Sequence, residues 1–147
     1  ASQIAERLLT LLDAQATRAP RLDRRILVAC VEGNDHEFGA RLLASAFERQ
    51  GWQVVLLGAN TPAAELATAA EQFRPDLIAL SAGTALHVRA SAATVAAIRA
   101  RVPERMPILV GGGVFAAVDG LWRDVGADGT AADAPSAIAL AAESLAD

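Results

Sequence analysis

One loop of the sequence combines a histidine with polar neighbours, and its imidazole could bind a metal ion. His36 lies between Asp35 and Glu37, two residues after Asn34, and follows a run of apolar residues. Imidazole is the commonest metal ligand in proteins, and a carboxylate, amide or carbonyl usually holds its second ring nitrogen. Asn34 is placed to make that hydrogen bond. The alternative is a solvent-exposed histidine at the start of a helix.

Small residues follow the other apolar runs and leave room for a large ligand. A GxGxxG fingerprint is absent after the first apolar run, which disfavours a dinucleotide site, and a P-loop is absent as well. Lysine is absent too, so the acidic trio with a lysine of a phospho-receiver cannot be built. The candidate site residues in these loops are Gly39, Leu57, Gly58, Asn60, Ser81, Gly83, Thr84, Gly111, Gly112, Gly113, Phe115 and Thr130.

The elements that position these loops follow a repeated strand–helix pattern. Apolar segments predict strands at residues 25–30, 53–57, 77–81, 108–110 and near 128–131. Helix-period stripes predict helices over 38–47, 66–73, 88–102, 114–125 and 138–145. The middle three strands are continuous apolar runs, which is typical of strands buried on both faces. The fold class is therefore α/β, a doubly wound five-stranded parallel sheet of the Rossmann or flavodoxin-like type.

In an open parallel sheet, ligands bind beyond the carboxyl ends of the strands, where the candidate loops lie. Two helix starts are predicted from side chains that can cap them: Thr61, with Pro62 at the first helical position, and Asp133. An extra helix is expected over residues 2–15. We expect residues 1–24 to form this helix and a connector, and residues 25–147 to form the α/β domain.

Composition bounds the function. The 147 residues are 53% hydrophobic and 20% charged, which is too apolar for a disordered chain. The net charge of −4 makes direct nucleic-acid binding by this domain an unfavoured role. No run suits a membrane span or signal peptide, so a cytoplasmic protein without a membrane partner is expected. Cys30, the single cysteine, is interpreted as a small buried hydrophobe.

Three motifs in register resemble those of cobalamin-binding domains. Asn34-x-His36-x-x-Gly39 resembles the family's Asp-x-His-x-x-Gly signature, Ser81-Ala82-Gly83 stands where the family has Ser-x-Leu, and Gly111-Gly112 stands where it has Gly-Gly. The resemblance covers residues 25–146. The stretch from Leu57 to Pro62 resembles the cobalamin domains of MerR-type regulators and bacterial light sensors more than those of methyltransferases or mutases.

The resemblance implies that His36 coordinates cobalt from the lower face and displaces the cofactor's dimethylbenzimidazole. The nucleotide tail would then enter a slot lined by the serine and the glycines. Two departures bear on affinity: Asn34 replaces the usual Asp, which makes the imidazole a weaker donor, and Gly83 replaces Leu, which loosens the slot. The implied cofactor is adenosylcobalamin or methylcobalamin, with haem as the alternative tetrapyrrole.

Three functions follow from this interpretation. The first is a sensory or regulatory cobalamin domain, including one that senses light, which works with a helical capping module or an output protein and can form homo-oligomers. The second is the corrinoid carrier of a methyltransferase or mutase. The third is a haem-binding or cofactor-free interaction module. The chain offers no self-sufficient catalytic group, so an enzyme is the less favoured interpretation. His87 is interpreted as a polar residue at a helix start, with the ligand tail or haem as its alternative contact.

Overall fold

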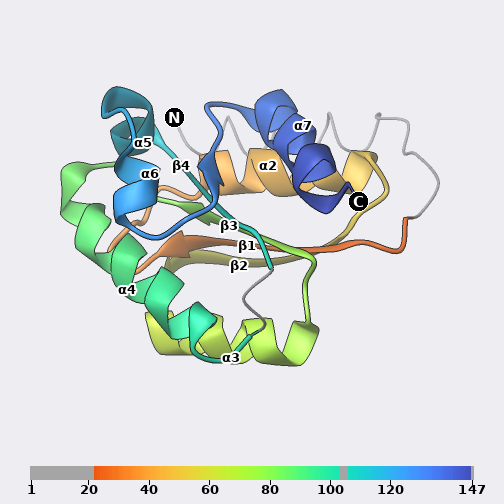
Figure 1. The fold of residues 1–147 in the computed structure, drawn as a ribbon, viewed down its shortest axis with the longest axis horizontal. Helices are drawn as coiled ribbons and strands as arrows, with labels where there is room; N and C mark the ends of the chain where they lie inside the picture. Colours follow the sequence, from red (N-terminus) through yellow and green to blue (C-terminus); the bar gives the residue numbers. More distant parts are fainter. Residues whose placement is uncertain (1–21, 103–105, 147) are drawn as a thin grey trace.

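A parallel sheet of five strands forms the centre of the computed structural model, which describes residues 22–102 and 106–146. The strands are β1 (Arg25–Val31), β2 (Gln53–Thr61), β3 (Leu77–Ser81), β4 (Ile108–Gly111) and β5 (Gly129–Thr130), in the order β2-β1-β3-β4-β5 (Figure 1). This order confirms the doubly wound prediction. It reverses direction between β1 and β3, and ligands of such sheets bind at that switch point. The helix predicted over residues 2–15 lies outside the described residues.

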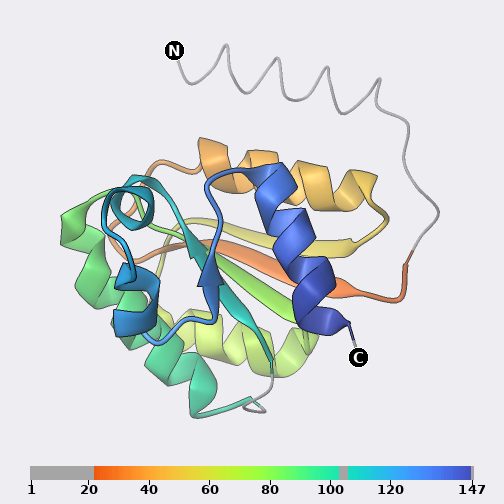
Figure 2. The ribbon, with the colours of Figure 1, turned by 45° about the horizontal axis from the view of Figure 1, so that its top comes forward.

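Helices cover both faces of the sheet. Figures 1 and 2 show α2 (Phe38–Arg49) and α7 (Ala134–Leu145) on one face, and α3 (Ala63–Phe73) and α4 (Val88–Arg99) on the other. In the described part of the chain there are also three short helical segments: η1 (Ala85–His87), α5 (Gly113–Ala117) and α6 (Leu121–Asp124). Within the described ranges, no helix is both long and apolar enough to cross a bilayer.

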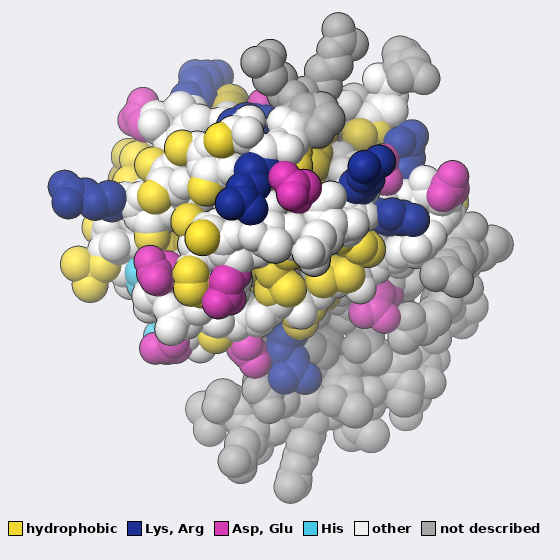
Figure 3. Space-filling model, turned by 90° about the horizontal axis from the view of Figure 1, so that it is seen from below, with side chains coloured by type: hydrophobic (Ala, Val, Ile, Leu, Met, Phe, Trp, Pro, Cys, Tyr) yellow, Lys and Arg dark blue, Asp and Glu magenta, His cyan; other side chains and the backbone are white. Residues whose placement is uncertain are grey.

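The core is divided between these two faces because successive residues of a strand point to opposite sides. In β1, Leu27, Ala29 and Val31 belong to the cluster that α3 and α4 cover. Ile26, Val28 and Cys30 belong to the cluster that α2 and α7 cover. On the α3 side, the molecular surface mixes apolar, basic and acidic side chains (Figure 3).

One predicted helix cap is confirmed and the other is wrong. Asp133 caps α7, and its carboxylate accepts a hydrogen bond from the Ser136 backbone N–H at 2.8 Å. Hydrogen bonds with the Ser136 side chain and with this N–H lower the pKa of Asp133. Thr61 is instead the last residue of β2, and Pro62, in an extended conformation, occupies the N-cap of α3. The Thr61 hydroxyl donates to the Gly58 carbonyl at 3.3 Å, so it turns back into its own strand.

Two further expectations need correction. β2 runs to Thr61, beyond the predicted end at residue 57, and it is only partly buried because it lies at the sheet edge with β1 as its partner. The single helix predicted over 114–125 is two helices, α5 and α6. Val118 is extended and Gly120 adopts a left-handed conformation with φ 76°, so the chain turns between them despite the continuous apolar stripe.

Candidate functional site

The loop between β1 and α2 presents His36 at the carboxyl end of the sheet, where its side chain is exposed. Beneath it, Asn34 is buried. The Asn34 Oδ1 accepts a hydrogen bond from the His36 backbone N–H at 3.2 Å, and Asn34 Nδ2 donates to the Ser81 carbonyl at 3.0 Å. The expected bond from the Asn34 amide to the imidazole ring is therefore replaced by bonds to the backbone. Asn34 shapes the loop and ties it to β3.

Neighbouring elements also hold this loop. Asn60, at the end of β2, accepts a hydrogen bond from the Gly33 N–H at 2.8 Å through its Oδ1. Glu37 Oε2 accepts from the Ala59 N–H at 2.9 Å, and Glu37 Oε1 lies 3.9 Å from an Arg41 guanidinium nitrogen. The peptide that carries the exposed imidazole is thus fixed by strands on both sides of β1.

A cavity of about 390 Å³ lies between α2, α7 and the sheet, next to this loop. We call it the slot. Most of its wall is apolar, and small side chains are frequent in it. The slot is lined by Val28, Gly39, Ala40, Leu42, Leu43, Phe47, Arg49, Ala79, Leu80, Ser81, Leu109, Val110, Gly111, Gly112, Ala131, Ala132, Asp133, Ala134 and Ala137.

The slot brings together four of the predicted site residues: Gly39, Ser81, Gly111 and Gly112. A Cβ added at Gly39 would meet nothing within 4 Å, so this side of α2 opens into free space. A Cβ at Gly112 would lie 1.9 Å from the Ala82 carbonyl oxygen, so this glycine is required by the chain itself. An open, apolar slot beside an exposed imidazole fits a cofactor that offers a metal at one end and an aromatic tail at the other.

Sequence reasoning missed the walls that the helices contribute to the slot. Ala40 and Leu43 face it from α2, and Ala134 and Ala137 face it from α7. Their spacing of three residues places each pair on one helix face. The available signal was alanine in both helices: Ala40 in α2, and Ala134 and Ala137 in α7.

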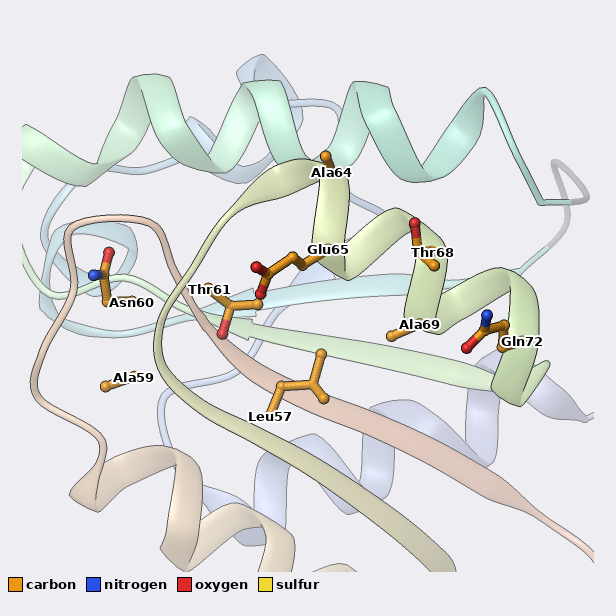
Figure 4. A pocket seen from close by; sticks show the side chains of 9 residues that line it. All are labelled: Leu57, Ala59, Asn60, Thr61, Ala64, Glu65, Thr68, Ala69 and Gln72. Atoms are coloured by element: carbon orange, nitrogen blue, oxygen red, sulfur yellow. The ribbon is translucent and has the colours of Figure 1, made fainter.

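A second cavity, of about 490 Å³, lies at the opposite face, between β2 and α3. Leu57 and Asn60, which were expected beside the cofactor, line this cavity and not the slot. In Figure 4, Leu57 points toward α3 and Glu65 reaches back toward Thr61. The extension of β2 to Thr61 places both predicted residues within the strand, and Gly58 with them.

The remaining predicted residues occupy varied places. Phe115 is buried in the core cluster that α3 and α4 cover. Asp35 and Thr84 are exposed, and Thr130 pairs with Val110 in the sheet. Gly83 and Gly113 lie where two loops meet: the carbonyl of Gly83 accepts a hydrogen bond at 3.1 Å from the N–H of Val114, the residue after Gly113. These residues surround the loops of the site without lining the slot.

Cys30 lies below the histidine loop as a protonated, buried thiol. Burial, and to a lesser extent the charge of Glu37, raise its pKa to about 11, while a hydrogen bond with Ser81 acts in the opposite direction. Its Sγ donates to the His36 carbonyl at 3.8 Å. This agrees with its interpretation as a small buried hydrophobe. Among the described residues, no three or more His, Cys, Asp or Glu side chains gather into a metal-binding group.

Known proteins resemble this chain over the same region. The HTH-type transcriptional repressor CarA of Myxococcus xanthus is 44% identical over 89 residues, which are 60% of this chain and 30% of CarA. Corrinoid protein DSY3155 of Desulfitobacterium hafniense is 29% identical over 119 residues, 80% of this chain and 54% of that protein. The chain therefore spans only part of the length of these relatives.

The fold has solved counterparts as well. The monomethylamine corrinoid protein of Methanosarcina barkeri superposes with a TM-score of 0.75 at 20% identity, covering 96% of this chain and 64% of that one. The family model described as B12 binding domain matches residues 24–139, which include the histidine loop and all five strands. The chain therefore belongs to the B12-binding domain family.

Proposed function

We propose that this domain binds cobalamin with the cofactor's dimethylbenzimidazole released from cobalt. His36 would be the lower axial ligand, and the nucleotide tail would lie in the slot. The observation that carries this proposal is the slot of about 390 Å³, which begins at Gly39, three residues after the exposed His36. A bound corrinoid would supply a cobalt centre with exchangeable upper ligands. The chain's own residues supply the lower ligand and the pocket.

The role of Asn34 sets the character of His36 in this proposal. Its amide oxygen holds the His36 backbone and its amide nitrogen holds Ser81, so the loop is prearranged before a ligand arrives. Both groups of this amide bond to backbone and carry no charge, so Asn34 does not strengthen the imidazole as a donor in the way that a hydrogen-bonded carboxylate would. We therefore propose a lower ligand that cobalt releases more readily, which suits a domain whose ligand set changes with a signal.

We propose a regulatory role for the domain, with light as one signal that would act through adenosylcobalamin. The support is the 44% identity to part of CarA, a transcriptional repressor. A helical capping module or an output protein would contact the upper face of the cofactor, and a change in that contact would alter the assembly. Gel filtration of the adenosylcobalamin form, in darkness and after green light, tests this role. Identical elution and identical spectra would contradict light sensing.

The binding proposal is tested most directly by the identity of the axial nitrogen. Protein labelled uniformly with ¹⁵N is loaded with natural-abundance hydroxocobalamin, desalted and reduced to the cob(II)alamin state. A histidine ligand would split the electron paramagnetic resonance lines into doublets, whereas the cofactor's own base would give triplets. His36→Ala should lose the doublets. The proposal fails if the wild type retains no corrinoid or gives triplets, and retention of haem would redirect it.

A second candidate is a corrinoid carrier for methyl transfer. It is favoured by the 29% identity to corrinoid protein DSY3155, which extends over 80% of this chain. Methyl transfer from the methylcobalamin-loaded domain to an added methyltransferase and thiol acceptor separates the carrier from the regulator. Transfer at catalytic rates would favour the carrier, and light-dependent assembly without transfer would favour the regulator.

A further inference from the structure

His87 connects two loops of the site that are far apart in sequence. Its Nδ1 lies 3.2 Å from the backbone nitrogen of Gly83 and 3.2 Å from that of Thr84, both in the loop after β3. Its Nε2 lies 3.2 Å from the carbonyl oxygen of Gly33, in the loop that carries His36. The ring edge also packs on Gly33, since a Cβ added there would meet His87 Cδ2 at 3.5 Å.

These partners fix the tautomer of the ring. Both backbone N–H groups point at Nδ1, so Nδ1 must accept, and the neutral imidazole then carries its hydrogen on Nε2. That hydrogen is donated to the Gly33 carbonyl. Both polar atoms of the ring are therefore used by backbone groups, and His87 spans 54 residues of sequence between Gly33 and itself.

Gly33 is held at both ends of its backbone as a result. Asn60 Oδ1 accepts from its N–H at 2.8 Å, and His87 Nε2 donates to its carbonyl. Gly33 has φ 89°, a left-handed conformation that turns the chain from β1 toward His36. A peptide fixed at this turn fixes the path of the three residues that lead to the imidazole.

We propose that His87 is a positioning residue for His36: its neutral ring ties Gly33 to the loop after β3 and so orients the His36 loop for its metal. The inference rests on the proposed function, in which His36 is the lower axial ligand. The bonds of His87 lie on the side of the loop opposite to Asn60, so its loss leaves Gly33 anchored on one side only.

Three substitutions separate the two contacts of the ring. His87→Ala removes both. His87→Asn keeps an acceptor near the position of Nδ1, for Gly83 and Thr84, but is too short to reach Gly33. His87→Gln extends an amide donor toward the position of Nε2. Thr94→Ala is the matched structural control, because the Thr94 hydroxyl is buried and bonds to the Ala90 carbonyl at 2.8 Å within α4.

The link that His87 makes between Gly33 and the loop after β3, which we call the clamp, is tested in the cofactor-free protein by amide hydrogen exchange. In His87→Ala the amides of residues 33–36, 83 and 84 should exchange about tenfold faster than in the wild type, because each lost hydrogen bond lowers the cost of local opening. In His87→Asn only residues 33–36 should exchange faster. Unchanged exchange at residues 33–36 in His87→Ala would overturn the clamp.

The positioning role is tested by spectral titration with hydroxocobalamin and by the ¹⁵N splitting of cob(II)alamin. His87→Ala and His87→Asn should bind about tenfold more weakly and show a smaller doublet fraction, and His87→Gln should recover part of both. Thr94→Ala should lower thermal stability without changing either reading. The inference fails if His87→Ala binds as the wild type does, or if affinity follows stability in all four variants. Failure of the wild type to bind would overturn the proposed function as well.

Discussion

The two faces of the sheet are packed in different ways. Between the sheet and α3 and α4, large aliphatic side chains such as Leu66, Val95 and Ile98 are buried together. Between the sheet and α2 and α7, several positions are alanine, and the slot of about 390 Å³ remains. Stability and ligand space are thus separated: one face supplies packing, and the other leaves room because its side chains are small.

Gly112 lines the slot but has no free space for a Cβ, unlike Gly39. Its substitution should therefore cause the largest loss of stability. Gly112→Ala places a Cβ 1.9 Å from the Ala82 carbonyl oxygen at a φ of 118°. We expect a loss of about 3–4 kcal/mol of unfolding free energy, measured by urea denaturation, because backbone must shift. Gly120→Ala is the control, since it has φ 76° and open space around the Cβ, and it should cost only about 1 kcal/mol. Equal losses in both variants would contradict the role of the clash.

The contrast between the faces predicts unequal costs for the same truncation. Leu66, on the inner face of α3, is fully buried, so Leu66→Ala should cost about 3 kcal/mol. Leu43 lines the slot and is half-buried, so Leu43→Ala should cost about 1 kcal/mol, because fewer contacts are lost. Urea denaturation of both cofactor-free variants provides the comparison. A larger loss at Leu43 would mean that the slot is a packed core, and the comparison would be wrong.

The fold was predictable because local pattern and global architecture agree in this chain. Each predicted strand exists, and the continuous apolar runs at Leu77–Ser81 and Ile108–Gly111 became the buried centre of the sheet. The break between α5 and α6 was missed because the apolar stripe was followed across it, although Asp119-Gly120 is a turn signal in the sequence. The edge position of β2 depends on strand order, which hydrophobic pattern alone does not specify.

The site was predictable where motifs mark strand ends and less so where contacts span distant loops. Gly39, Ser81, Gly111 and Gly112 meet in one slot because parallel strands end at the same edge. Asn34 lies two residues from His36, but its hydrogen bonds are to backbone, which spacing does not show. The bond from His87 to Gly33 joins residues 54 positions apart and depends on the tertiary fold.

Filling the slot should separate cofactor binding from stability. Gly39→Leu adds a side chain where a Cβ meets nothing within 4 Å, so cobalamin affinity should fall about tenfold or more while unfolding free energy changes by about 0.5 kcal/mol or less. Ala64→Leu, which enlarges an exposed side chain at the cavity on the opposite face, is the matched control and should leave affinity unchanged. Weaker binding in Ala64→Leu alone would place the cofactor on the other face.

The smallest expected effect is a pH dependence that Cys30 introduces on the slot side. Burial raises the pKa of its thiol from 9.0 to about 11 in the folded chain. Between these values the unfolded chain has lost the thiol proton and the folded chain keeps it, so stability falls as pH rises. We expect a loss of about 1 kcal/mol between pH 8 and pH 10.

The composition of the chain leaves the Cys30 thiol with little interference from other titrating groups in this measurement. All 13 basic residues are arginine and tyrosine is absent, so few other groups titrate in this range. Urea denaturation of the wild type and Cys30→Ala at both pH values gives the difference, and Cys30→Ala should show the flatter profile even if its overall stability is lower. Parallel profiles would mean that the folded chain ionises the thiol as readily as the unfolded chain does. The end of β1 below His36 would then be open to water, and Cys30 would belong to the accessible slot and not to the packed core.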